Sequence, residues 1–377
     1  MTPFWRTLGR RAARQDWAAW LLSLFLLAVG LAFVYSASWR GEETGIVGAW
    51  FPKQVEWAAI GTGVALLLAL TNYHVWIRHA WWLYGASILL LALTPVVGRK
   101  FYGAYRWIVL FGVQVQPSEF AKVALVLVLA RVLANPAVEP RSFALALGVA
   151  GIAAVPFALI LAEPDLGTAL TILPTALAML WVAGLKWRWL AVGAASAAAA
   201  APLAWYFVMD GYQKERVMVF LDPSRDPLNS GWNALQSAIA VGSGGLWGKG
   251  YLQGTQNVLG FLPRTVSPSD FIFPVIAEEK GFVGSAVLLG AFAILLACYL
   301  RAAARAPDPQ GGLLATGLAA LLFCHVFVNI GMTIGLLPIT GLPLPFISSG
   351  GSFMLGTMAA FGLVQSVYAH RQPRETL

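Results

Sequence analysis

Apolar runs of membrane-spanning length recur along this 377-residue chain, and they limit its possible folds more than any other feature. A helix crosses the hydrocarbon core of a bilayer with about 20 mostly apolar residues. Hydrophobic residues make up 59% of the chain and charged residues only 11%, whereas ordinary soluble domains carry about 25% charged residues. The low charge excludes a soluble enzyme and predicts an all-α, polytopic membrane protein, folded as one domain over residues 1–377.

The runs predict ten membrane-spanning helices. They are Trp17–Ser36, Val55–Leu70, Trp81–Val97, Glu119–Leu133, Phe143–Leu161, Leu166–Leu185, Trp189–Val208, Phe271–Leu300, Leu313–Leu337 and Phe353–Tyr368. The first run has about twenty residues and exceeds the ~7–15-residue core of a signal peptide, so we interpret it as a retained span. A long polar insert, residues 209–270, separates the seventh and eighth spans and forms a large extracytoplasmic loop.

Charged residues are distributed unevenly between the two sides that these spans define. Thirteen lysines and arginines fall on the side of the N-terminus and five in the short loops opposite, whereas thirteen of the seventeen acids fall opposite. Positive charge collects in the cytoplasmic loops of membrane proteins. We therefore expect cytoplasmic termini and a polar cavity open to the outside, with a net charge of +8 that contacts anionic lipid rather than nucleic acid.

The insert and the last outer loop contain three further patterns. "NALQSAIAV" predicts a short amphipathic helix on the bilayer surface. The five glycines of "GSGGLWGKG" suit either close backbone contact with a phosphate or a flexible turn before a re-entrant segment, and both interpretations stay open. "LLPITGLPLPFISSGGS" predicts a rigid turn whose Ser348, Ser349 and Ser352 line the mouth of the cavity.

Two similar hexapeptides, "VQPSEF" and "VSPSDF", place Glu119 and Asp270 at the start of apolar runs. Capping alone explains each acid taken singly, because serine caps helices and the helix dipole favours an acid in the first turn. The surroundings favour chemistry, since Lys122 lies one turn after Glu119 on the same helix face. Other outer segments add Arg99, Lys100, Arg106, Trp107 and Asp165. Ionisable groups at membrane depth are costly, so such a set predicts a site for a large anionic headgroup on a lipid tail.

Several other chemistries lack candidates in this sequence. Cys298 and Cys324 lie inside apolar runs and form no thiolate metal site. His325 is alone in the ninth span, and we interpret it as a buried hydrogen-bonding residue rather than a metal ligand. No Ser–His–Asp arrangement appears on the outer side, so acyl hydrolysis is not expected.

The chain resembles the SEDS family, the polytopic peptidoglycan glycosyltransferases of shape, elongation, division and sporulation, over nearly its whole length. The motifs that carry the resemblance are "YSAS", "QPSEFAK", "EPDLGT", "QSAIAVGSGGLWGKG", "DFIFPVIAEEKG" and "NIGMTIGLLPITGLPLPFISSGGS". "GTQNVLGFLP" and "VNIGMTIGLLP" look more like the elongation branch than the division branch. "RTVSPSDF" is two residues longer than is usual before the aspartate, and "ISSGG" lacks a usual tyrosine.

The resemblance implies an activity and a set of site residues. Lipid II would be the donor, and the sugar end of another lipid II or of a growing glycan strand would be the acceptor. Asp270 matches the essential aspartate of the family and is the expected general base, ionised at neutral pH. The substrate-binding set comprises Glu119, Lys122, Arg106, Trp107, Asp165, Arg216, Lys249, Gln256 and Ser348. Among these, Arg106, Arg216 and Lys249 are candidate clamps for the pyrophosphate, and Glu119 with Lys122 forms either a substrate contact or a structural ion pair.

The resemblance also bears on cofactors, partners and place. No resident metal or cofactor is required, and a divalent cation at the pyrophosphate stays open. The expected partners are lipid II, the nascent glycan strand, membrane lipid and a class B penicillin-binding protein, and the expected place is the bacterial inner membrane with an extracytoplasmic active site. Two rival functions remain, a flippase for a lipid-linked precursor and a non-catalytic scaffold for a cell-wall transpeptidase.

Overall fold

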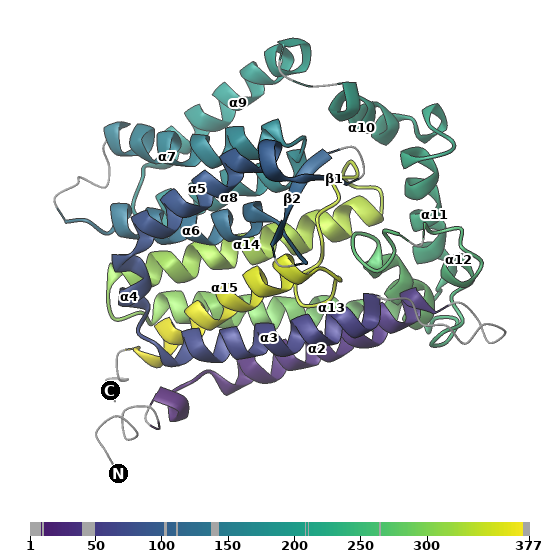
Figure 1. Ribbon diagram of the computed structural model, residues 1–377, viewed down its shortest axis with the longest axis horizontal. Helices are drawn as coiled ribbons and strands as arrows, with labels where there is room; N and C mark the ends of the chain where they lie inside the picture. The colour runs from purple at the N-terminus through teal and green to yellow at the C-terminus, as the bar shows by residue number, and fades with distance from the viewer. Residues whose placement is uncertain are drawn as a thin grey trace.

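Figure 1 shows a computed structural model that describes residues 9, 11–39, 50–101, 104–110, 112–136, 143–207, 209, 211–263 and 265–371. Ten described helices of 17 residues or more coincide in order and position with the ten predicted spans. These are α2 (Trp17–Ser38), α3 (Trp50–Leu70), α5 (Ala80–Val97), α6 (Pro117–Leu133), α7 (Phe143–Ala162), α8 (Leu166–Val182), α9 (Trp187–Phe207), α13 (Ile272–Ala304), α14 (Pro309–Thr333) and α15 (Gly351–Ala369). The predicted all-α polytopic architecture is confirmed.

The ten helices differ in how well each could cross a bilayer alone. Among the described helices, α2, α3, α5, α7, α13, α14 and α15 are long and apolar enough to span a membrane, and α8 is a shorter apolar helix. Buried residues make up 72% of the most apolar window of α14 and 78% of that of α15, against 22–44% in the other five. The side chains of α14 and α15 therefore face protein more than lipid, and polar groups on them find protein partners.

Short elements fill the connections. They are α4 (Tyr73–Arg78) on one side and, within the insert, α10 (Gly211–Leu221), the 3-10 turn η1 (Pro223–Arg225), α11 (Ser230–Ser243) and α12 (Thr255–Val258). The predicted helix "NALQSAIAV" lies inside α11. Ser237 and Ala240 of α11 are buried, and Ser237 Oγ donates to Thr333 O of α14 at 2.7 Å, so this face of α11 packs on the helix bundle. Its position relative to a bilayer stays a prediction.

A small antiparallel sheet was not expected from the sequence. Strands β1 (Arg99–Phe101), β2 (Ala104–Leu110) and β3 (Val113–Val115) pair in the order β1-β2-β3 between α5 and α6. Gly112 turns the chain between β2 and β3 with φ +81°, a conformation that favours glycine. The sheet fixes the direction of Arg106, which lies in the middle of β2.

The two ends of the described chain meet on one side of the bundle. The Asp16 side chain caps α2 and pairs with Arg301 near the end of α13, while the Asp16 N–H donates to Gln365 Oε1 near the end of α15 at 2.9 Å. The insert helices α10, α11 and α12 lie at the opposite end of the bundle (Figure 1). This arrangement agrees with an even number of spans. Of the basic residues counted for orientation, Arg6, Arg10, Arg40, Arg141 and Arg374 lie outside the described residues.

The glycine-rich segment "GSGGLWGKG", residues 242–250, packs against α13 at a point where that helix is interrupted. At Gly281 the helix has φ 65° and ψ −162°, so the regular hydrogen bonds stop there. The segment replaces them: Lys249 N and Gly250 N donate to the carbonyl oxygens of Glu278 and Glu279 at 3.0 and 3.1 Å, and Phe282 N donates to Gly245 O at 2.8 Å. A broken helix at membrane depth is tolerated when its backbone groups regain partners in this way.

The close approach explains the glycines. A Cβ on Gly244 would lie 2.1 Å from Ala277 O, and one on Gly248 would lie 2.2 Å from Glu279 O. The backbone of "GSGGLWGKG" therefore packs on α13. This contact is a third interpretation, in addition to the phosphate contact and the flexible turn that the sequence left open.

Candidate active site

Asp270 lies at the last turn before α13, and the backbone around it is held by three successive hydrogen bonds. Ser349 N–H donates to Pro268 O at 2.9 Å, Ser348 Oγ donates to Ser269 O at 2.6 Å, and Asn329 Nδ2 donates to Asp270 O at 2.9 Å. The donors come from α14 and from residues 340–349, the later part of the connection between α14 and α15, here called the 340–349 loop. The carbonyl oxygens of residues 268–270 are thereby satisfied, and the position of Asp270 is fixed relative to that loop.

The carboxylate of Asp270 faces a mixed electrostatic environment. The residue is half-buried, yet protein atoms surround its carboxyl closely, and this burial raises the pKa of Asp270 to about 7. Arg216 opposes the rise, Asp165 adds to it, and a hydrogen bond from Ser269 and the charge of Arg106 also lower the pKa. This direction runs against the expectation of an ionised Asp270 at neutral pH, because burial of the carboxyl outweighs the neighbouring cations; the protonation state itself stays a prediction.

Arg216 reaches the site from α10. Its Nη1 donates to Thr340 O at 2.8 Å, next to Gly341, where a Cβ would lie 3.2 Å from Asp270 Oδ2. Gly341 has φ +77° and brings the loop backbone close to the carboxylate. The insert, the 340–349 loop and the turn before α13 thus converge on the Asp270 carboxyl.

Arg106 and Asp165 are the other charged residues that act on the same carboxylate. The Arg106 guanidinium donates from Nε to Glu163 O at 3.0 Å and from Nη2 to Pro164 O. Asp165 caps α8 by accepting from Thr168 N at 3.3 Å and also accepts from Gln116 Nε2 at 3.3 Å. The predicted roles of Arg106 and Asp165 toward substrate stay predictions, and both residues lie within electrostatic reach of Asp270. Trp107 is the next residue after Arg106 in β2, and it pairs with Arg99 of β1 in the strand register.

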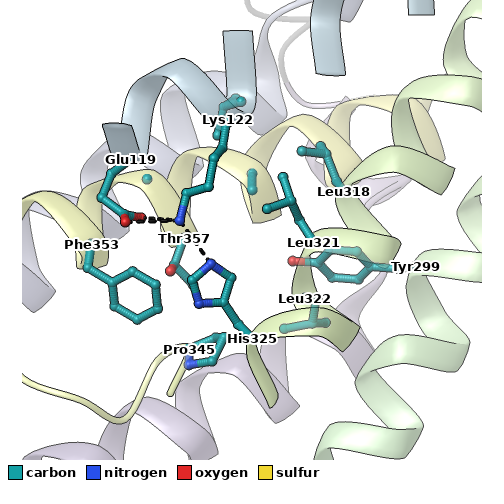
Figure 2. Close-up of a pocket in the computed structure, with 13 residues that line it drawn as sticks. Glu119, Lys122, Tyr299, Leu318, Leu321, Leu322, His325, Pro345, Phe353 and Thr357 are labelled. Carbon is teal, nitrogen blue, oxygen red and sulfur yellow. Dashed lines mark hydrogen bonds and ion pairs between the residues drawn. The ribbon is translucent and has the colours of Figure 1, made fainter. Parts of the chain in front are cut away.

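Glu119 and Lys122 form a separate buried cluster (Figure 2). Lys122 Nζ lies 2.9 Å from both Glu119 carboxyl oxygens, and the side chains are only 3% and 5% exposed. The same Nζ lies 2.9 Å from Nε2 of His325 on α14. The three side chains line one end of a small, largely apolar pocket, which Tyr299, Leu318, Leu322 and Phe353 also line.

Lys249 and Gln256 belong to a third group, around the start of α13. Lys249 Nζ pairs with Glu278 Oε1 at 2.6 Å, and Gln256 N–H donates to the same oxygen at 3.0 Å. Glu278 is fully buried, and neither Lys249 nor Gln256 is among the groups that shift the pKa of Asp270. Their predicted contacts with substrate stay predictions, and here both residues stabilise a buried carboxylate.

Ser348 is completely buried, and its hydroxyl is used twice. It accepts from Leu344 N at 2.8 Å and donates to Ser269 O. Ser349 and Ser352 are also buried, and Ser352 Oγ accepts from Gln116 N at 2.9 Å. In this structure the three serines lie beneath the surface rather than at a cavity mouth.

The whole chain was compared with known families and proteins. A sequence model of the FtsW, RodA and SpoVE family, described as cell cycle proteins, matches residues 16–373. The chain belongs to this family.

Individual members of the FtsW/RodA/SpoVE family agree with that assignment. Peptidoglycan glycosyltransferase MrdB of Escherichia coli (strain K12) is 42% identical over 356 residues, with 93% of each chain covered. Peptidoglycan glycosyltransferase RodA of Treponema pallidum (strain Nichols) is 33% identical, with 94% of this chain and 98% of the relative covered.

Solved structures agree as well. The fold matches that of Thermus thermophilus rod shape determining protein RodA with a TM-score of 0.69 and 32% identity, covering 95% of this chain and 98% of that chain. It also matches a chain from a study of how a peptidoglycan synthase complex coordinates polymerization and crosslinking. That match has a TM-score of 0.77 and 35% identity, and it covers 94% of this chain and 97% of that chain. The family predicted from the motifs is confirmed.

Within this FtsW/RodA/SpoVE-family fold, sequence reasoning missed three residues: Asn329, which bonds to Asp270 O; Gln116, which bonds to Asp165; and Glu163, whose carbonyl oxygen accepts from Arg106. Asn329 was only part of a quoted motif, and Gln116 precedes the acid that drew attention. Glu163 is buried, and neither of its carboxyl oxygens has a hydrogen-bond partner of normal geometry among the described residues. Burial raises the pKa of Glu163 to about 8, against a lowering hydrogen bond from Thr94. For Asn329 the signal that could have identified it is a polar residue inside an otherwise apolar segment.

The part of the chain that the structure describes contains no cluster of metal-ligating side chains. No group of three or more His, Cys, Asp or Glu side chains there is arranged to hold an ion. The side chains of Arg99 and Lys100, which the sequence analysis placed near the headgroup, lie outside the described residues. Among the described residues, the cations that lower the pKa of Asp270 are Arg216 and Arg106.

Proposed function

We propose that this protein is a peptidoglycan glycosyltransferase that polymerises lipid II, with Asp270 as the general base. The observation that carries the proposal is the state of Asp270: its backbone is held by three hydrogen bonds, while its carboxyl faces Arg216 and Arg106 with a pKa of about 7. A general base works best when its pKa lies near the operating pH. The names of the relatives support the enzyme class.

The reaction is an inverting transfer in one displacement. A hydroxyl of the acceptor GlcNAc attacks the anomeric carbon of the donor MurNAc, and its proton passes to the Asp270 carboxylate as the new C–O bond forms. The bond between that carbon and the pyrophosphate oxygen breaks, and undecaprenyl pyrophosphate leaves with the bonding electrons. Proton transfer to a positioned base contributes ~100- to 10,000-fold.

The leaving group gains negative charge during this step. Arg216 and Arg106 are the described cations that act on Asp270, and they are therefore the ones best placed to stabilise that charge. Both guanidiniums are anchored to main-chain carbonyl oxygens, at Thr340 and at Glu163 with Pro164, so they are oriented before substrate arrives. We assign them, rather than Lys249, to the pyrophosphate.

The proposal includes a cellular location and a protein partner. The excess of basic residues on the side of the described chain ends supports cytoplasmic termini in the bacterial inner membrane and an active site outside it. A class B penicillin-binding protein is the proposed partner, which the similarity to a chain of a peptidoglycan synthase complex supports.

Polymerisation of lipid II by the purified protein tests the proposal, with and without that partner. Asp270→Asn is expected to lose glycan synthesis by ~100-fold or more, because it removes the base. Glu215→Gln, an exposed acid in the same insert, is the matched control and is expected to behave as wild type. An undiminished rate in Asp270→Asn would rule out the base, and no glycan from wild type under any partner condition would favour lipid transport or scaffolding.

A further inference from the structure

Two polar side chains of α14 link the sites described above: one contacts the segment at Asp270, and the other contacts the Glu119–Lys122 pair. His325 and Asn329 are four residues apart, so they lie one above the other on the same face of the helix. Asn329 bonds to Asp270, and His325 bonds to Lys122. The Asp270 site and the Glu119–Lys122 pair therefore have a common neighbour in α14.

Asn329 uses both of its amide hydrogens to join two segments. Its Nδ2 donates to Asp270 O at 2.9 Å and to Leu342 O at 2.7 Å. The residue is fully buried, and its Oδ1 has no hydrogen-bond partner among the described residues. A buried amide in this position is costly unless both bonds form, so the two carbonyl oxygens are held at a defined separation.

His325 makes the corresponding pair of contacts one turn away. A lysine ammonium only donates hydrogen bonds, so Nε2 of His325 accepts from Lys122 Nζ, and the ring proton is on Nδ1. Nδ1 then donates to Pro343 O at 3.3 Å. Protonating the ring would remove the acceptor and place two cations in contact, which burial makes unfavourable.

The two loop carbonyl oxygens that α14 holds belong to Leu342 and Pro343, the residues that directly follow the loop's contact with the Asp270 carboxylate. Leu342 and Pro343 follow Gly341, which packs against Asp270 Oδ2, and Thr340, whose carbonyl oxygen accepts from Arg216. A shift of the 340–349 loop would therefore move Arg216 relative to Asp270. Because Arg216 lowers the pKa of Asp270, the loop position bears on the protonation of that carboxyl.

We propose that His325 and Asn329 are positioning residues which couple the Glu119–Lys122 ion pair to Asp270 through the 340–349 loop. Neither residue touches substrate in this proposal. Lys122 acts through His325 rather than by binding the pyrophosphate, since its ammonium already contacts Glu119 and His325 in a buried position. The inference rests on the proposed function, because it assigns these residues to the reaction in which Asp270 is the base.

The test is the pH dependence of lipid II polymerisation by full-length variants. Asn329→Leu and His325→Leu are expected to lower kcat on the order of 10- to 100-fold, as misplacement of a catalytic group does, with little change in KM. In their pH–rate profiles, the rise in rate at acid pH is expected to move to higher pH, because a loosened loop releases Arg216 from Asp270. His325→Gln offers one acceptor and one donor in place of the ring nitrogens and is expected to restore most of the rate.

Thr333→Val is the matched control. Thr333 is buried on the same helix one turn beyond Asn329, but among the described residues its hydroxyl bonds only to Ile330 O within α14, so wild-type kinetics are expected. A double-mutant cycle of Lys122→Met with Asn329→Leu adds a direct measure of coupling. Residues that act as one network give non-additive effects.

The outcomes separate this inference from the function on which it depends. Shifted profiles, rescue by His325→Gln and a non-additive cycle would support the coupling. If Asp270→Asn is inactive while Asn329→Leu and His325→Leu keep the wild-type pH profile, or if the cycle is additive, the coupling is wrong and the base assignment stands. If Asp270→Asn remains active, the proposed function itself fails. Should a leucine variant not fold, Asn329→Ser and His325→Ala supply the same comparison, with His325→Gln kept as the rescue.

Discussion

Arg216 and Asp270 contact successive residues of one stretch of loop. The guanidinium donates to Thr340 O at 2.8 Å, and the next residue, Gly341, packs against Asp270 Oδ2. The attraction between the two charges lowers the pKa of Asp270, which burial raises more strongly, to about 7. The loop therefore sets both the approach of the cation and the basicity of the carboxylate.

This relationship predicts opposite pH shifts for two neutralising substitutions. The rate of polymerisation should rise with pH through about 7 as Asp270 loses its proton. Arg216→Gln removes the attraction between the guanidinium and the Asp270 carboxylate. The pKa of Asp270 should therefore rise, and the acid limb of the pH–rate profile should move to higher pH. Asp165→Asn removes a repulsion and keeps a residue able to cap α8, so the acid limb should move down. Initial rates measured across the pH range check both, and shifts in the same direction would contradict the assigned neighbours.

The buried ion pair predicts a large cost for removing one partner. Lys122→Met leaves Glu119 charged and unpaired, and breaking a buried pair in this way costs about 3–5 kcal/mol. The double variant Glu119→Gln with Lys122→Met should recover much of that loss. Thermal unfolding in detergent measures the effect, with Lys53→Met at an exposed lysine as control. An equal Tm for Lys122→Met and wild type would show that the pair contributes no stability.

The glycine packing against α13 predicts different effects at two neighbouring glycines. Gly244→Ala places a Cβ 2.1 Å from Ala277 O, and such overpacking costs about 1–3 kcal/mol. Gly242→Ala meets nothing within 4 Å and lies inside α11, where alanine is favoured over glycine by up to about 1 kcal/mol. The two Tm values should therefore move in opposite directions. A flexible turn would tolerate both changes equally.

Two adjacent serines predict a similar contrast next to Asp270. Ser348→Ala leaves Leu344 N and Ser269 O without partners, which costs about 1–3 kcal/mol and should also slow polymerisation, because Ser269 precedes the base. Ser349 Oγ has no hydrogen-bond partner among the described residues, so Ser349→Ala should leave stability and rate nearly unchanged. Equal losses in both variants would mean that the hydroxyl of Ser348 does not hold the segment.

Much of the architecture was accessible from local pattern. The ten apolar runs correspond to ten helices, and the motif resemblance identified the family that the comparisons confirm. The predicted enzyme class agrees with the names that the relatives carry. The i,i+3 spacing placed Glu119 and Lys122 on one helix face and left a substrate contact and a structural ion pair open; the structure shows the ion pair. The β1–β3 sheet escaped prediction because its strands are short and carry no clear alternation.

The sequence by itself therefore determined which segments are helices and which residues meet along one helix, since those properties depend on periodicity within a few turns. Only the tertiary structure decided which distant groups meet. Lys122 contacts His325, 203 residues away, and Arg216 faces Asp270 while Lys249 of the same insert pairs with Glu278. The physical reason is that a charge acts on its neighbours in space, and the burial that sets the pKa of Asp270 arises from packing among segments far apart in the chain.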